Sequence, residues 1–223
     1  MARTAMPSSI EELQALVDLA REHQFLLVND NPYSMILNEA PASILACKGA
    51  EDVALELNSL SKSHNMAGWR IGWVAGKKEF IDAVLRVKSN MDSGMFLGLQ
   101  HAAASALSNG KEWFESLNKV YSARKVIAKE ILDVLGCSYA ERQAGLFVWA
   151  KAPAMITDVE KWIDEILYGT KVFITPGFIF GSAGDRYIRI SLCCTEAALK
   201  EACERIKTFV KEPNRMEKAG IKH

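Results

Sequence analysis

The sequence predicts an α/β fold in two parts: a partial large domain, built on a sheet with flanking helices, and a small α+β domain after it. In the first part, short apolar runs that end in polar loops alternate with amphipathic segments, as expected of an α/β layer. A long amphipathic segment follows, and beyond it strands and helices mix without regular alternation. The length of 223 residues exceeds one typical domain and falls short of two large ones.

The first part is predicted to begin with a helix and three strands. Cap-type serines and first-turn carboxylates predict a helix over about residues 8–22, because they suit the free N–H groups and the positive end of a helix. Strands are predicted at the apolar runs Phe25–Val28, Ala54–Asn58 and Ile71–Gly76. Polar residues follow the first two runs, so we expect the ligand-binding and catalytic side chains to lie at these strand ends.

The later elements are predicted mainly by helical periodicity. Lys78–Leu107 is helical with a break near Ser93 and Gly94, and a long amphipathic helix covers about Glu112–Leu135. The second part is then predicted to contain helices at Asp158–Leu167 and Thr195–Lys211 and strands at Leu146–Trp149, Val172–Ile174 and Tyr187–Ile190.

Domain limits follow from this pattern. The partial large domain is placed at residues 1–112, and the small domain, including the long linking helix, at residues 113–212. Residues 213–223 have no apolar period and are predicted to be a loose tail.

Charge and cysteine content argue against several classes of function. Lysine and arginine total 27, as do aspartate and glutamate, so no net field attracts nucleic acid or an anionic membrane. Five cysteines without a C-x-x-C pair argue against a disulfide framework and a zinc site. Neither an apolar run of roughly 18 residues nor a leader-like segment is seen. We therefore expect a cytoplasmic protein that acts on small molecules, with no metal, nucleic-acid or membrane partner.

The strongest chemical signal is the segment Ser59–Gly72, which reads SLSKSHNMAGWRIG. Lys62 lies among serines at a predicted strand end, where partial desolvation favours the neutral amine that forms a Schiff base with an aldehyde cofactor. Ser59, Ser61 and Arg70 together could hold a phosphate through hydroxyl hydrogen bonds and a charge-assisted fork. From these residues alone, the alternative is a solvated lysine in a serine-rich turn.

This segment resembles the S-x-S-K-x-x-x-x-x-G-x-R signature of fold-type I pyridoxal phosphate (PLP) enzymes, in particular the class I and II aminotransferases. The resemblance implies that Lys62 is the catalytic lysine that binds PLP covalently, and that Ser59, Ser61 and Arg70 bind the cofactor phosphate. It also implies a PLP-transferase large domain, amino acid and 2-oxo acid substrates, and a homodimer in the full-length family.

A second candidate site is Asp30-Asn31-Pro32-Tyr33, directly after the first predicted strand. A carboxylate at the pyridine nitrogen of PLP keeps that nitrogen protonated and makes the ring an electron sink, and a phenol can hydrogen-bond the 3′ oxygen. Taken alone, Asp-Asn-Pro is also a common turn. The match to the D-x-x-Y motif of the family implies that Asp30 and Tyr33 bind the cofactor.

A third candidate is Arg189, within the apolar run Tyr187–Leu192 and after Pro176–Gly181. An arginine in such a strand is costly unless a carboxylate meets it, and its planar fork suits the α-carboxylate of an amino acid. The alternative is an arginine at a strand edge that faces water. The match to the P-G-x-x-F-G…R segment of aminotransferases implies that Arg189 binds the substrate carboxylate.

Two further expectations concern the surroundings of these sites. His64 has no carboxylate or second histidine beside it in the sequence, so we interpret it as a polar loop residue. The resemblance covers only the later half of a family member, so the glycine-rich phosphate loop and the aromatic that stacks on the cofactor are expected to lie outside this chain. Open apolar strand edges are therefore expected near Phe25–Val28 and Leu55–Leu57.

The sequence thus predicts a PLP-dependent aminotransferase, with weak activity for this part alone. Fold and cofactor do not determine the reaction, so a PLP-dependent lyase of the same fold is one alternative. A non-catalytic PLP- or ligand-binding regulatory domain is another, although neither a helix-turn-helix pattern nor a basic arm is recognisable. A catalytically dead fragment is the third.

Overall fold

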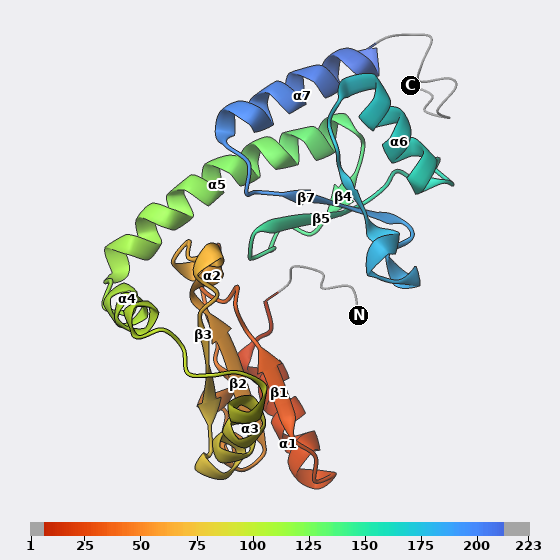
Figure 1. The fold of residues 1–223 in the computed structure, drawn as a ribbon. Coiled ribbons are helices and arrows are strands. Elements are labelled where there is room, and N and C mark those ends of the chain that lie inside the picture. The colour runs from red at the N-terminus through yellow and green to blue at the C-terminus, as the bar shows by residue number, and fades with distance from the viewer. Residues whose placement is uncertain (1–6, 212–223) are drawn as a thin grey trace. The chain divides into compact units, whose positions relative to one another are not determined.

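The computed structural model describes residues 7–211. These residues divide into two compact units, 7–116 and 117–211, and each unit has its own sheet (Figure 1). The mixed α/β architecture with helices flanking the sheets confirms the predicted fold class. The limits of the domains, 1–112 and 113–212, stay a prediction, and the predicted tail at 213–223 lies outside the described residues.

The first unit holds a three-stranded sheet in the order β1-β2-β3. Its strands are β1 Leu27–Asp30, β2 Ala54–Ser59 and β3 Gly72–Gly76. Strands β1 and β2 are parallel, with Asp30 opposite Leu57, whereas β3 is antiparallel to β2, with Gly72 opposite Ser59. The carboxyl ends of β1 and β2 therefore meet at one edge of the sheet, and β3 starts at the same edge.

Helices flank this sheet. They are α1 Ile10–Glu22, α2 Leu60–Ser63, α3 Lys78–Met91 and α4 Leu97–Leu107, and the 3-10 turns are η1 Ile44–Ala46, η2 Ala50–Asp52 and η3 Ala67–Trp69. Ser9 and Glu12 form a reciprocal capping box that starts α1. Figure 1 shows α1 beside β1 and α3 beside β3. Val17 of α1 packs with Ile44 and Ala54 in a core cluster under the sheet.

The second unit contains a four-stranded antiparallel sheet in the order β4-β5-β7-β6. Its elements are β4 Ser138–Tyr139, β5 Phe147–Lys151, α6 Val159–Thr170, β6 Thr175–Pro176, η4 Gly177–Phe180, η5 Ser182–Gly184, β7 Tyr187–Ser191 and α7 Glu196–Lys211. The long helix α5, Lys111–Val134, precedes them and begins within the first unit. Helices α5, α6 and α7 gather on one side of the sheet (Figure 1).

Two sequence expectations about the fold need correction, and one strand was missed. Val172–Ile174 form no strand; instead Thr175–Pro176 pair with β7, because only these residues lie beside Arg189 and Ile188. The short strand β4 was not predicted. The edge expected to be open near Leu55–Leu57 is closed, since β2 is the central strand and Leu55 is only 4% exposed.

The other expected open edge is confirmed. Phe25, Leu26 and Val28 are 41%, 45% and 49% exposed along β1 and the residues before it. Across residues 7–211, every helix is too short or too polar to cross a membrane.

Candidate functional site

The candidate site lies at the edge of the three-stranded sheet where β1 and β2 end. Strand β2 runs directly into α2, and Ser59 is both the last residue of the strand and the N-cap of the helix. Its hydroxyl accepts a hydrogen bond from the Ser61 N–H at 3.1 Å and donates one to the Ile71 carbonyl at 3.3 Å. This cap fixes the backbone of Lys62, the third residue of α2.

Lys62 and Tyr33 lie close together at this edge. The Nζ atom of Lys62 is 5.8 Å from the centroid of the Tyr33 ring, within the range of a cation–π contact. The Asn31 N–H donates to the Leu57 carbonyl at 2.8 Å, so the pairing of β1 with β2 continues one residue past Asp30. The structure thus brings the second predicted motif to the lysine turn.

A buried carboxylate ties together the strands that carry these motifs. Glu56 of β2 is 8% exposed and accepts hydrogen bonds from the Asn29 side chain at 3.3 Å, the Ser43 hydroxyl at 2.8 Å and the Ile44 N–H at 2.9 Å. Three donors offset the cost of burying a carboxylate. Sequence reasoning missed this role, although a glutamate within the apolar run Ala54–Asn58 was a signal for it.

The backbone between α2 and β3 is unusual. Asn65 and Arg70 have left-handed φ angles of 56° and 52°, a conformation that is costly for residues other than glycine and is common at functional sites. The Arg70 guanidinium donates to the Ala67 carbonyl at 3.0 Å. A Cβ atom at Gly72 would lie 2.5 Å from the Asn58 carbonyl oxygen, so glycine permits β3 to approach β2 here.

His64 lies in the turn that follows α2, as expected of a loop residue, but it is buried among aromatic rings, which the sequence did not predict. It is 8% exposed, its ring stacks on Trp113 with centroids 6.1 Å apart, and Phe114 contacts it edge-on at 5.4 Å. Burial lowers the pKa of His64, and a hydrogen bond to the Ala106 backbone acts in the opposite direction. The sequence gives little sign of this environment, since the rings that surround His64 lie far along the chain.

Arg189 lies in the second unit, on β7. Its guanidinium carbon is 4.1 Å from the Phe147 ring centroid and 4.2 Å from that of Phe180, so two aromatic rings hold it. Trp149 supports this arrangement by contacting Phe180 edge-on at 5.8 Å and stacking on Tyr187 at 5.3 Å. Stacking occupies the faces of a guanidinium and directs its N–H donors sideways, which suits a planar carboxylate.

The predicted site residues therefore fall into two groups. Those of the first unit, at or next to the strand ends of its sheet, are Asp30, Tyr33, Ser59, Ser61, Lys62 and Arg70. Arg189 belongs to the second unit. Within residues 7–211, no cluster of three or more histidine, cysteine, aspartate or glutamate residues is suited to a metal ion.

The donor set of the first group fits a phosphorylated pyridine aldehyde. Two hydroxyls and a guanidinium suit the phosphate, an amine suits the aldehyde, and a carboxylate at the end of β1 suits a protonated ring nitrogen.

Comparison with known proteins supports the same family. LL-diaminopimelate aminotransferase of Aquifex aeolicus (strain VF5) is 40% identical over 208 residues, which cover 92% of this chain and 54% of that protein. LL-diaminopimelate aminotransferase of Halothermothrix orenii (strain H 168) is 36% identical over 199 residues, covering 88% and 51%. The chain spans about half the length of the curated relatives it matches.

Solved structures of similar folds agree. A probable N-succinyldiaminopimelate aminotransferase from Thermus thermophilus has a TM-score of 0.83 and 31% identity, over 92% of this chain and 55% of that one. An aromatic aminotransferase from Pyrococcus horikoshii has a TM-score of 0.85 and 26% identity, over 95% and 57%. Residues 4–206 match the family described as aminotransferase class I and II, and the chain belongs to that family.

Proposed function

We propose that this chain carries the cofactor lysine and the substrate-binding arginine of a PLP-dependent aminotransferase, which transfers an amino group between an amino acid and a 2-oxo acid. The class I and II family uses PLP. The observation that carries the proposal is the position of the Lys62 Nζ, 5.8 Å from the Tyr33 ring centroid at the edge where β1 and β2 end.

Each site residue has a role in this proposal. When bound, PLP supplies an electron-withdrawing pyridine ring. Lys62 would hold PLP through its Nζ and, when that amine is free, would move a proton at the substrate Cα. Asp30 holds a proton at the ring nitrogen, and Tyr33 donates a hydrogen bond to the 3′ oxygen.

The remaining residues bind charged groups. Ser59, Ser61 and Arg70 bind the cofactor phosphate through charge-assisted hydrogen bonds. Arg189 binds the α-carboxylate of the amino acid, and its two flanking rings keep the guanidinium oriented. The names of the curated relatives make LL-diaminopimelate the first amino acid to test, and we choose 2-oxoglutarate as the 2-oxo acid for the assay. We also propose that the working protein is a cytoplasmic homodimer, as the composition and the resemblance to the full-length family suggest.

The covalent role of Lys62 is tested by trapping. The purified chain is incubated with PLP, reduced with borohydride and digested, and the pyridoxyl group is located by mass spectrometry. We expect it on Lys62 in the parent and its loss in Lys62→Ala. Lys77→Ala is the matched control, because Lys77 is exposed and pairs with Asp52 at 3.2 Å. A pyridoxyl group on Lys77 or Lys78 in place of Lys62 would show that the assignment is wrong.

The role of Asp30 needs a separate measurement. In a protein with measurable turnover, Asp30→Asn should leave trapping at Lys62 unchanged but slow transamination by about 100-fold, the order of effect of a positioned proton partner. The two readouts are the trapped fraction and the rate with LL-diaminopimelate and 2-oxoglutarate. Equal turnover of the variant and the parent would exclude this role for Asp30.

A further inference from the structure

Two buried polar residues directly follow Lys62, and the proposed chemistry uses neither. Ser63 is 3% exposed and His64 is 8% exposed. Buried polar side chains are costly unless their hydrogen bonds are made, so their presence beside the lysine requires a structural account.

Hydrogen bonds join these two residues to the helix that carries Lys62. The Ser63 hydroxyl lies 2.9 Å from His64 Nδ1 and 3.2 Å from the Ser59 carbonyl oxygen. The His64 N–H donates to the Leu60 carbonyl at 3.1 Å and closes α2. His64 therefore contacts the turn through its imidazole, which meets the Ser63 hydroxyl, and through its own backbone N–H.

Aromatic contacts join the same turn to the start of α5. The His64 ring packs against Trp113 and Phe114, and the Trp113 Nε1–H donates to the Ser63 carbonyl at 2.9 Å. The bond between His64 and the Ala106 backbone adds a contact with the end of α4. Helix α2 is thus anchored to residues that are distant in the sequence.

Helix α2 needs such an anchor because it is only four residues long. A single helical turn is not stable by itself. Leu60 packs on Met66, Ile71 and Ala103 in a small core cluster, and Ser63 and His64 are also buried, whereas Lys62 is partly exposed. Fixing the buried side of the turn fixes the direction of the lysine side chain on the other side.

We propose that His64 is a positioning residue for Lys62. Through Ser63 it holds the α2 turn against the start of α5 and the end of α4, and so keeps the Lys62 amine at the Tyr33 ring. The functional part of this inference depends on the proposed cofactor role of Lys62, whereas the clamp itself can be measured without cofactor.

The first measurement is amide hydrogen exchange of the peptide that spans residues 59–66, without cofactor. In His64→Ala and His64→Phe, exchange of this peptide should be faster by about tenfold, the factor that one lost hydrogen bond is worth. His101→Ala is the matched control, since His101 is an exposed histidine on α4, and its exchange should equal that of the parent. Parent-like exchange in His64→Ala would overturn the clamp.

The second measurement separates positioning from packing. His64→Phe retains a ring between Trp113 and Phe114 but lacks the Nδ1 atom that hydrogen-bonds the Ser63 hydroxyl. We expect it to recover the melting temperature lost in His64→Ala while borohydride trapping of PLP at Lys62 stays slower than in the parent by about tenfold. Full recovery of trapping in His64→Phe would reduce His64 to a packing residue and overturn the proposal.

A third outcome distinguishes this inference from the proposed function. If PLP is not trapped at Lys62 in the parent, the cofactor role of Lys62 fails. The exchange of residues 59–66 then still decides the clamp: faster exchange in both His64 variants, with an unchanged His101→Ala, supports it, and unchanged exchange rejects it.

Discussion

The two units of the chain differ in how they cover their apolar surface. In the second unit, α6 buries five residues at helical spacing, among them Trp162 and Ile166, and β5 buries three consecutive residues. In the first unit, no residue of α3, Lys78–Met91, is buried among the described residues. Its exposed side chains include Leu85 at 55% and Val87 at 60%.

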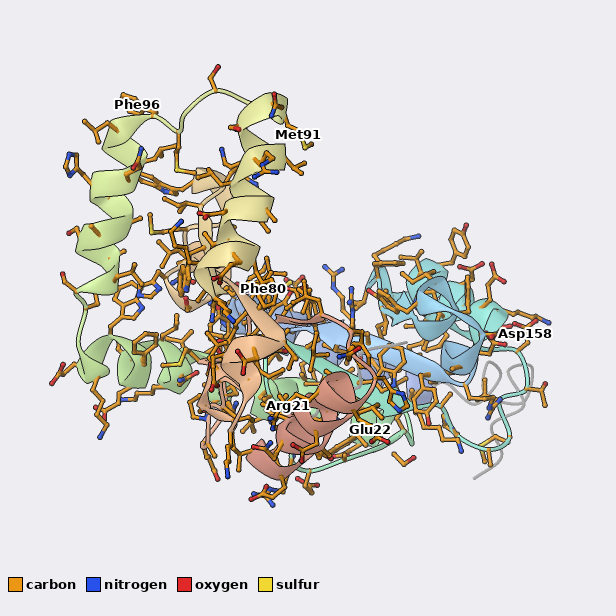
Figure 2. The ribbon with its side chains drawn as sticks, turned by 90° about the horizontal axis from the view of Figure 1, so that it is seen from below. Arg21, Glu22, Phe80, Met91, Phe96 and Asp158 are labelled. Carbon is orange, nitrogen blue, oxygen red and sulfur yellow. The ribbon has the colours of Figure 1, made fainter. Side chains whose placement is uncertain are left out.

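The loop after α3 continues this exposed surface. Figure 2 labels Met91 and Phe96 at its two ends, and these side chains are 79% and 75% exposed. Apolar exposure of this kind is typical of faces that bind other protein surface. The difference between the two helices is that α6, in the unit carrying Arg189, buries an apolar stripe, whereas α3, in the unit carrying Lys62, leaves its apolar side chains exposed.

The largest expected effect tests that difference directly. Ile166→Ala in α6 removes a fully buried side chain and should lower the free energy of unfolding by about 2–5 kcal/mol. Leu85→Ala in α3 should change it by less than about 0.5 kcal/mol, because that side chain is exposed. Urea unfolding of the two variants measures both values. Similar losses would mean that α3 is covered in solution.

A smaller loss in the free energy of unfolding is expected for a substitution at the point where β3 approaches β2 closely. Gly72→Ala places a methyl group 2.5 Å from the Asn58 carbonyl oxygen, so the backbone must shift at a cost of about 1–3 kcal/mol. Gly68→Ala is the matched control, because nothing lies within 4 Å of its Cβ position. Urea unfolding compares the two, and an equal stability of both variants would contradict the close approach.

The units should also respond differently to acid. Burial lowers the pKa of His64 from its ordinary 6.5, so below pH 6.5 the unfolded chain binds a proton that the folded chain resists. His64 therefore makes the first unit less stable as the pH falls through 6.5, until the folded pKa is reached. Residues 117–211 contain no histidine, and their lowered carboxylate pKa values, such as that of Glu141, act below 4.5.

Hydrogen exchange of the two units above and below pH 6.5 measures this contrast. The loss of stability as the pH falls below 6.5 should be confined to the first unit, and it should be absent in His64→Phe. A parallel loss in the second unit, or an unchanged loss in His64→Phe, would assign the effect to other groups.

A substitution at the open edge of the first sheet is expected to have the smallest effect on stability. It should nevertheless change the self-association of the protein. Val28→Lys on β1 should change the free energy of unfolding by less than about 0.5 kcal/mol but reduce concentration-dependent self-association, because a charge on an exposed strand blocks edge pairing. Tyr168→Lys, at a 71% exposed position of α6, is the control and should not alter association. Size-exclusion chromatography over a range of concentrations compares them.

The sequence by itself determined most of the helices and strands and indicated the family. Local rules suffice for a helix start such as Ser9 with Glu12, and for a strand such as the one predicted at Ala54–Asn58. The spacing of serines, lysine and arginine around Lys62 indicated a cofactor site, and it also indicated the family that the comparison then confirmed. These features depend on neighbouring residues, so they can be recognised in the chain alone.

Only the tertiary structure decided which strand is central, where β6 lies and what surrounds the functional side chains. Strand β2 is central because β1 and β3 pair with its two edges, and β6 forms at Thr175 because β7 lies beside it. The environment of His64 comes from Trp113 and Phe114, on another helix. Pairing and burial depend on contacts between residues far apart in the chain, and the local periodicity of hydrophobicity carries no information about which distant segments meet.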